Sequence, residues 1–244
     1  PLLGHLIEAV YAGGRLLRRT EDALDALGRA GATGELAEAL RLLAVIRLFK
    51  GDATQAEAPA TAALELYCAQ GNSQGEAWAA QHLAWIAFIK GNIEEGERRI
   101  RQSVQLFEAA GDRTGLMWSL GLEANLLFHG GAAEEAAEVA EVVLEEAELA
   151  DNPWGQGMML TVLAQVALWR GDTAGAADRA EAAVALLEPL GDPFGVAQAR
   201  LVMGRAQVMV GRVHNGMAEL ERATREGGEQ VTNQAVSRST CEAL

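Results

Sequence analysis

The chain has 244 residues, a net charge of −14, and a composition that is 50% hydrophobic but only 5% aromatic. This acidic balance disfavours direct binding to nucleic acid or to anionic membranes, because both of these surfaces are themselves negative. No apolar run approaches the roughly 20 residues of a membrane span, and the two cysteines, Cys68 and Cys241, lack metal-binding spacing. We therefore expect a cytoplasmic protein with reduced thiols, no bound metal and no cofactor.

Turn residues recur along the chain at a fixed interval of forty residues, in two series that are offset by twenty. They are Gly31, Gly51, Gly71, Gly91, Gly111, Gly131, Asp151, Gly171, Gly191 and Gly211. The segments between them are rich in Ala, Leu and Glu and have the periodicity of amphipathic helices. A constant period with two helical segments per unit predicts an all-α, right-handed solenoid of helical hairpins, with about six helix pairs.

In chain order, a first helix pair over residues 2–12 and 16–27 fits the period loosely, and five regular pairs follow. Their predicted bounds are Thr33–Lys50, Ala53–Gln70, Ser73–Lys90, Ile93–Ala110, Arg113–His129, Ala132–Leu149, Pro153–Arg170, Thr173–Leu190, Pro193–Val210 and Val213–Glu226. We divide the chain into an N-terminal degenerate repeat or cap at 1–30, five repeats at 31–227, and a C-terminal capping or truncated helix at 228–244. Because Pro1 leads straight into a helical segment, we expect a fragment of a longer polypeptide.

Two local patterns predict how the helices begin and pack. Asn152 and Asp192 each precede a proline, which favours a capped helix start, and Ser73 with Glu76 resembles a capping box. Small residues recur every forty positions in both helices of a pair, which predicts a close approach of the two backbones. These residues are Ala44, Ala84, Ala124, Ala164 and Gly204 in the first helices and Ala56, Gly96, Ala136, Ala176 and Gly216 in the second.

With these residues the chain resembles the tetratricopeptide repeat (TPR) family. Leu83-Ala84, Leu163-Ala164 and Met203-Gly204 match the family's Leu-Gly pair, and a turn glycine follows each pair after seven residues. The unit is longer than the usual roughly 34 residues, the first helices lack the family's tyrosine, and Glu123 replaces a leucine in the fourth repeat.

The long unit is similar to the C-terminal TPR regions of large bacterial ATP-dependent transcriptional regulators of the maltose-activator and antibiotic-regulator kind. It is also similar to long-repeat scaffolds that bind peptides or helices in eukaryotic signalling. The resemblance implies a non-catalytic fold that senses a ligand or partner.

The residues themselves also favour a protein that is not an enzyme. Gly71-Asn72-Ser73-Gln74-Gly75 matches G-x-S-x-G, but that nucleophile motif follows a strand, and the preceding segment here is helical in pattern. The histidines lie in different repeats without a second ligand at i+4, so we expect surface or groove histidines and no metal site. They are His5, His82, His129 and His214.

The resemblance further implies that the first helix of each pair lines a concave groove. Four of the five tryptophans fall at positions that point into the groove in the family. Each aromatic ring can bury about 150–250 Å², and neighbouring amides could hydrogen-bond an extended peptide or the polar rim of an amphipathic helix. The alternative is that these rings pack between helices. The predicted partner-binding residues are Trp78, Gln81, Trp85, Phe88, Trp118, Asn125, Phe128, His129, Gln165, Trp169 and Arg205.

We therefore expect a scaffold that binds a protein, a peptide, an amphipathic helix or a small apolar inducer, as the sensor or partner-binding part of a larger bacterial transcriptional or signalling regulator. The alternative is a self-assembly module that forms a homodimer when an apolar face or a terminal repeat packs on a second copy.

Overall fold

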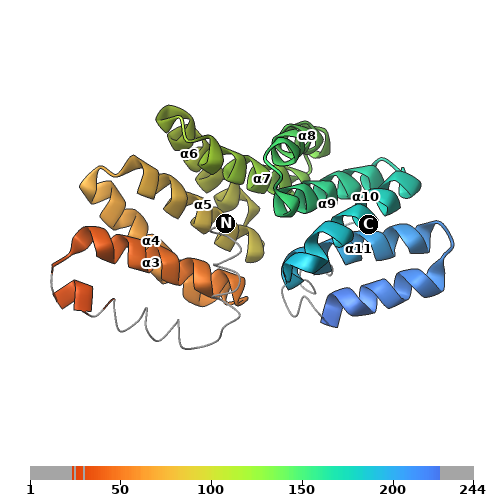
Figure 1. Cartoon of the computed structure of the whole chain (residues 1–244), viewed down its shortest axis with the longest axis horizontal. Coiled ribbons are helices and arrows are strands. Elements are labelled where there is room, and N and C mark those ends of the chain that lie inside the picture. Colours follow the sequence, from red (N-terminus) through yellow and green to blue (C-terminus); the bar gives the residue numbers. More distant parts are fainter. Residues whose placement is uncertain (1–23, 25, 30, 226–244) are drawn as a thin grey trace. The chain divides into compact units, whose positions relative to one another are not determined.

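The computed structural model describes residues 24, 26–29 and 31–225, which form helices joined by short turns (Figure 1). No strand occurs within these residues, and none of their helices is long and apolar enough to cross a membrane. The prediction of an all-α chain of helical hairpins is thus confirmed. The predicted cap at 1–30 lies largely outside the described residues, and the predicted helix at 228–244, together with His5 and Cys241, lies wholly outside them.

The helices alternate between the first and second members of successive hairpins, which we call A and B helices. Odd labels in Figure 1 mark A helices and even labels mark B helices. The bounds are α3 (Thr33–Phe49), α4 (Ala53–Gln70), α5 (Ser73–Ile89), α6 (Ile93–Ala110), α7 (Arg113–Gly130), α8 (Ala133–Leu149), α9 (Pro153–Trp169), α10 (Thr173–Leu187), the 3-10 helix η1 (Glu188–Leu190) and α11 (Pro193–Met209), followed by helical residues 213–225.

Most bounds agree with the predicted ones to within a residue, and the largest difference is at the end of α10. The helix predicted to run to Leu190 ends at Leu187 and continues as the 3-10 helix η1. Pro189 explains the change, because it has no backbone N–H to donate to the preceding turn of an α-helix.

The chain divides into two compact units, residues 1–122 and 123–244, with the boundary inside α7. In the first unit the helices α3 to α6 pack each against the next one in the chain, and in the second unit the helices α8 to α11 do the same. The A helices of successive repeats also meet, since α3 contacts α5 and α9 contacts α11. Each unit therefore has one layer of A helices and one layer of B helices.

Short turns with a capping side chain begin most helices. Asn152 Oδ1 accepts the Gly155 N–H at 3.2 Å, and Asp192 caps α11 in the same way, as predicted. The prediction for α5 was wrong. Its cap is Asn72, and Ser73 is the first helical residue, because the turn places Asn72 outside the helix with its side chain toward the free N–H groups.

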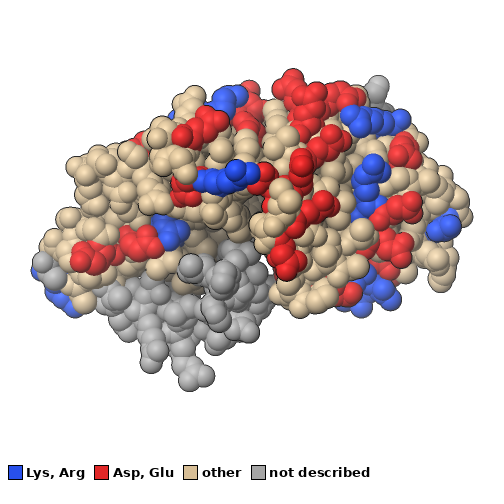
Figure 2. Space-filling view, turned by 45° about the horizontal axis from the view of Figure 1, so that its top comes forward, with Lys and Arg blue, Asp and Glu red and all other residues tan. Residues whose placement is uncertain are grey.

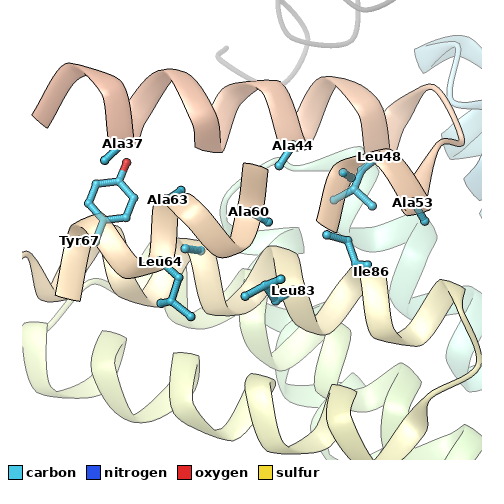
Figure 3. Packing of buried hydrophobic residues seen from close by; sticks show 12 residues of the cluster. Ala37, Ala44, Leu48, Ala53, Ala60, Ala63, Leu64, Tyr67, Leu83 and Ile86 are labelled. Carbon is cyan, nitrogen blue, oxygen red and sulfur yellow. The ribbon is translucent and has the colours of Figure 1, made fainter. Parts of the chain in front are cut away.

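Small side chains line the contact between the A and B helices. In the first unit Ala44 and Ala56 are fully buried in a cluster with Leu48, Leu83 and Ile86, part of which Figure 3 shows. In the second unit, a Cβ built on Gly216 would lie 2.6 Å from the carbonyl oxygen of Gly204. The backbones therefore approach as closely as the small-residue pattern predicts, and these positions cannot accept larger side chains without moving a helix.

Candidate functional site

The A helices, which carry the predicted contact residues, are enclosed over most of their length. No residue is exposed between 77 and 88 of α5, between 153 and 168 of α9, or between 194 and 208 of α11. The B helices instead have one exposed side, as the row of exposed glutamates in α8 shows. The exposed surface of the A helices is thus concentrated at their ends and at the half-buried rings.

In the first unit, Trp78 and Trp85 of α5 and Trp118 of α7 are half-buried. Trp78 makes an edge-to-face contact with Phe107 of α6, with ring centroids 5.0 Å apart. Phe88 is buried. Part of this aromatic surface is therefore used inside the fold, as the packing alternative predicts, and the three tryptophans remain partly exposed.

Buried polar groups lie beside these rings. Gln81 is only 3% exposed, and its Oε1 has no hydrogen-bond partner among the described residues. His82 is 6% exposed, and its ring stacks on that of Trp78 with the centroids 6.1 Å apart. Its Nδ1 likewise has no hydrogen-bond partner in the part of the chain that the structure describes. The expectation of a surface or groove histidine was thus wrong for His82, because the ring lies on the inner side of α5. Burial, reinforced by the Arg41 charge, lowers the pKa of His82 to about 3.

An ion pair and a tyrosine tie α3 to α4 in the same unit. Arg41 Nε donates to Glu38 Oε2 at 2.9 Å, and the Tyr67 hydroxyl donates to the same oxygen at 2.7 Å. Although burial opposes ionisation, these bonds hold the pKa of Glu38 below its usual value. Burial and the bond to Glu38 together raise the pKa of Tyr67 to about 12. The charges compensate each other locally, which indicates a structural role for this cluster.

In the second unit, the predicted residues divide between core and surface. Phe128 of α7 is buried in a cluster with Ala133 and Ala136, and His129 packs edge-on against it at 5.7 Å. Gln165 is buried, and no described residue forms a hydrogen bond with its Oε1. Asn125 and Arg205, which were also predicted, are half-buried on α7 and α11.

Trp169 is the predicted residue that offers the largest exposed surface. It ends α9 and is 61% exposed, whereas Met209, forty residues later at the end of α11, is 62% exposed. Because α9 contacts α11, both side chains lie at the same end of two neighbouring A helices. The forty-residue interval from Trp169 places Met209 at the corresponding groove-facing position of the last repeat, although Met209 is not among the predicted partner-binding residues.

Two kinds of chemistry considered from the sequence, a serine nucleophile and a metal site, can be compared with the described residues. Ser73 is an exposed residue in the first turn of α5, and the element before it is the helix α4 and not a strand. Within the described ranges, no group of three His, Cys, Asp or Glu side chains is placed to hold a metal ion.

Comparison with known proteins supports the fold. No protein-family model matches the sequence, and no curated protein matches it significantly. Solved structures do match. BtubC (BKLC) from P. vanneervenii is 18% identical with a TM-score of 0.63, and the match covers 87% of this chain and 89% of that one.

Two further structures share the fold. A signal transduction ATPase with numerous domains, with a tetratricopeptide repeat sensor, from Pyrococcus horikoshii is 15% identical with a TM-score of 0.59. That match covers 83% of this chain but only 31% of the larger protein. A putative kinesin light chain with nearly identical TPR-like repeats from Podosopora anserina is 16% identical, with a TM-score of 0.54 and coverage of 78% and 93%. The chain therefore has a TPR-like repeat fold.

Proposed function

We propose that the chain is a non-catalytic scaffold that binds a protein or peptide partner through its A helices. The observation that carries the proposal is the exposure of Trp169 beside Met209 at the ends of α9 and α11. Large apolar side chains that lie together on a surface are typical of interaction sites, and tryptophan is among the residues that contribute most to binding energy.

The chemistry of this region fits a peptide segment with apolar side chains. Trp169 and Met209 supply apolar area, while Arg205, which is half-buried on α11, adds a polar group. Such a combination suits either an extended peptide or one face of an amphipathic helix. A small apolar inducer is the other ligand that this surface would accept. In the first unit, the half-buried rings of Trp78, Trp85 and Trp118 are a separate candidate contact surface.

The experiment is a selection of peptides from a random display library on the whole chain, followed by affinity measurements on variants. For peptides that bind this surface, Trp169→Ala with Met209→Ala should weaken binding by about thirtyfold, which corresponds to about 2 kcal/mol. Gln105→Ala is the control, since Gln105 is exposed on the B helix α6 and belongs to neither proposed surface. If the selected peptides bind the double variant as well as the unaltered chain, the proposed surface is wrong.

A wider role follows if the scaffold belongs to a larger protein. We propose that the chain is the sensor or partner-binding part of a cytoplasmic bacterial transcriptional or signalling regulator. Support comes from the Pyrococcus horikoshii ATPase, whose TPR region is described as a sensor and shares this fold. Measuring activity of a full-length regulator with and without Trp169→Ala would test the role, because a sensor variant should lose its response while keeping basal activity.

Self-assembly is the second candidate, and one observation favours it. Val213 and Met217 are about half exposed, yet they correspond by eighty residues to Ala133 and Ala137, which are buried in a cluster with Val166 of α9. The same face of the last described helix is thus open to another helix. Light scattering over a range of concentrations tests this, and Met217→Glu should convert any dimer to monomer. A monomer at every concentration removes the candidate.

A further inference from the structure

The B helix α8 differs from the other B helices in its charge. Its sequence, AEEAAEVAEVVLEEAEL, contains seven glutamates and no basic residue. In α6 basic residues of the same helix neutralise part of the negative charge, since Glu95 pairs with both Arg98 and Arg99. Glutamates at i,i+3 and i,i+4 spacing repel each other along α8. Arg170 of α9 pairs with Glu134 of α8, but both side chains are exposed, and ion pairs at exposed sites are weak.

Two apolar side chains occupy the middle of this acidic surface. Val142 is 55% exposed and Leu149 is 77% exposed. The buried side of α8 is formed by small residues such as Ala136, Ala140 and Ala147. At about 100° per residue, Val142 and Leu149 point almost directly away from that buried side. Their exposure therefore cannot be explained by packing within the hairpin.

The glutamates flank these two residues on both sides of the helix. With the same rotation of about 100° per residue, Glu138 and Glu145 lie on one side of the Val142–Leu149 line and Glu146 lies on the other. The two apolar residues are two turns apart, or about 10 Å along the axis. The outer face of α8 thus has an apolar centre between acidic margins, and Figure 2 shows acidic side chains gathered on the face it views.

The other repeats lack these apolar residues at equivalent positions. Residues that align with Val142 at intervals of forty are Ala62, Gln102, Ala182 and Arg222, and those that align with Leu149 in the other B helices are Ala69, Ala109 and Pro189. A solvated helix needs no large apolar residue at these positions, and the other B helices have none. The valine and leucine are therefore a feature of one repeat and not of the repeat pattern.

We propose that the outer face of α8 is a docking surface for a basic amphipathic helix of a partner protein. Leucine-sized side chains of the partner pack on Val142 and Leu149, and Lys or Arg residues on either side of them meet the glutamates. Charge complementarity selects this partner, because the acidic margins repel an acidic helix and attract a basic one. This surface lies on a B helix, and its existence does not depend on the proposed A-helix site.

The test uses a labelled synthetic helix with a leucine stripe flanked by lysines and arginines, and a scrambled peptide of the same composition without a stripe. Binding to the whole chain is followed by fluorescence anisotropy at low and at physiological salt. We expect the striped peptide to bind more tightly than the scrambled one, with affinity that falls as salt rises. Val142→Ser with Leu149→Ser should weaken binding about tenfold or more, whereas Val142→Ile with Leu149→Met should restore it.

A charge-matched pair of variants separates a specific site from general attraction to an acidic protein. Glu138→Gln with Glu145→Gln alters α8, and Glu94→Gln with Glu108→Gln removes the same charge from exposed positions of α6. All four positions are at the surface, so both variants should fold, as circular dichroism would verify. Loss confined to the α8 variant supports the proposal. Equal loss in both variants, or no preference for the striped peptide, or no binding at low salt, overturns it.

Discussion

The ring of Phe107 occupies the space that a side chain on Gly115 would need. A Cβ built on Gly115 would lie 2.3 Å from Cε1 of Phe107, which is fully buried. The same relationship joins Tyr67 of α4 to Gly75 of α5, forty residues earlier. A glycine in the first turn of the A helix thus receives a ring from the preceding B helix, and this contact holds one repeat against the next.

Gly115→Ala should destabilise the first unit by about 1–3 kcal/mol, because overpacking a closed core forces side chains out of their rotamers. Its equivalent in the second unit is the control. Gly155 faces Ala147, and a Cβ there would meet the alanine at 3.1 Å. Gly155→Ala should therefore have a much smaller effect. The midpoint of urea unfolding measures both, and equal losses would mean that the ring contact is unimportant.

The repeat architecture could be predicted from sequence because glycine turns and small residues mark every unit at the same interval. The contact between Phe107 and Gly115 was equally visible as a forty-residue pattern, but its partners lie in different helices, so spacing alone does not reveal that they touch. The α5 cap was misassigned for a related reason. Asn72 and Ser73 are both good capping residues, and only the backbone path decides between them.

Ala132→Asn should stabilise the second unit by about 1 kcal/mol, within the range measured for helix caps. Ala132 precedes α8 with φ −89° and ψ 60° and provides no capping side chain, whereas Asn92 has φ −89° and ψ 78° and accepts the Glu95 N–H. Asparagine is preferred to aspartate here because of the nearby glutamates of α8. Thermal unfolding by circular dichroism measures the gain. Asn152→Ala is the reciprocal variant, and it should cost a similar amount.

Asp151→Gly should also stabilise the second unit, by up to about 1 kcal/mol. Asp151 has φ 48°, in the left-handed region, where the equivalent turn residue Gly111 has φ 65°. A residue with a Cβ pays roughly 1–2 kcal/mol for this conformation, and glycine does not. Gly111→Asp should lower stability by a similar amount in the first unit. An unchanged melting temperature for Asp151→Gly would show that the aspartate compensates through its side chain.

The candidate site was less predictable than the fold, because exposure depends on tertiary packing. Positions inferred from the family placed Phe128 and Trp169 on the same surface, yet Phe128 is buried among alanines and Trp169 is 61% exposed. The small residues of α8 leave space that Phe128 fills. Trp169, at the end of α9, is left largely uncovered by the described residues. The position of a residue within its repeat therefore does not predict whether its side chain is buried or exposed.

His82 should make the first unit less stable as the pH falls below about 6.5. Burial, and secondarily the charge of Arg41, lowers the pKa of His82 from 6.5 to about 3 in the folded chain. The unfolded chain therefore binds a proton at a higher pH than the folded chain does. The stabilising contribution is complete above the unfolded pKa and is lost progressively as the pH decreases toward 3, with a slope of at most about 1.4 kcal/mol per pH unit.

Urea unfolding between pH 7 and pH 5 isolates this effect, because carboxylates titrate mainly below that window. His82→Phe should flatten the dependence on pH in this range, even if the absolute stability changes. His214→Gln is the control, since His214 is exposed in helical residues 213–225 and its replacement should leave the slope unaltered. If His82→Phe retains the full slope, the ring is not buried as a neutral group, and the loss of stability at mildly acidic pH has another source.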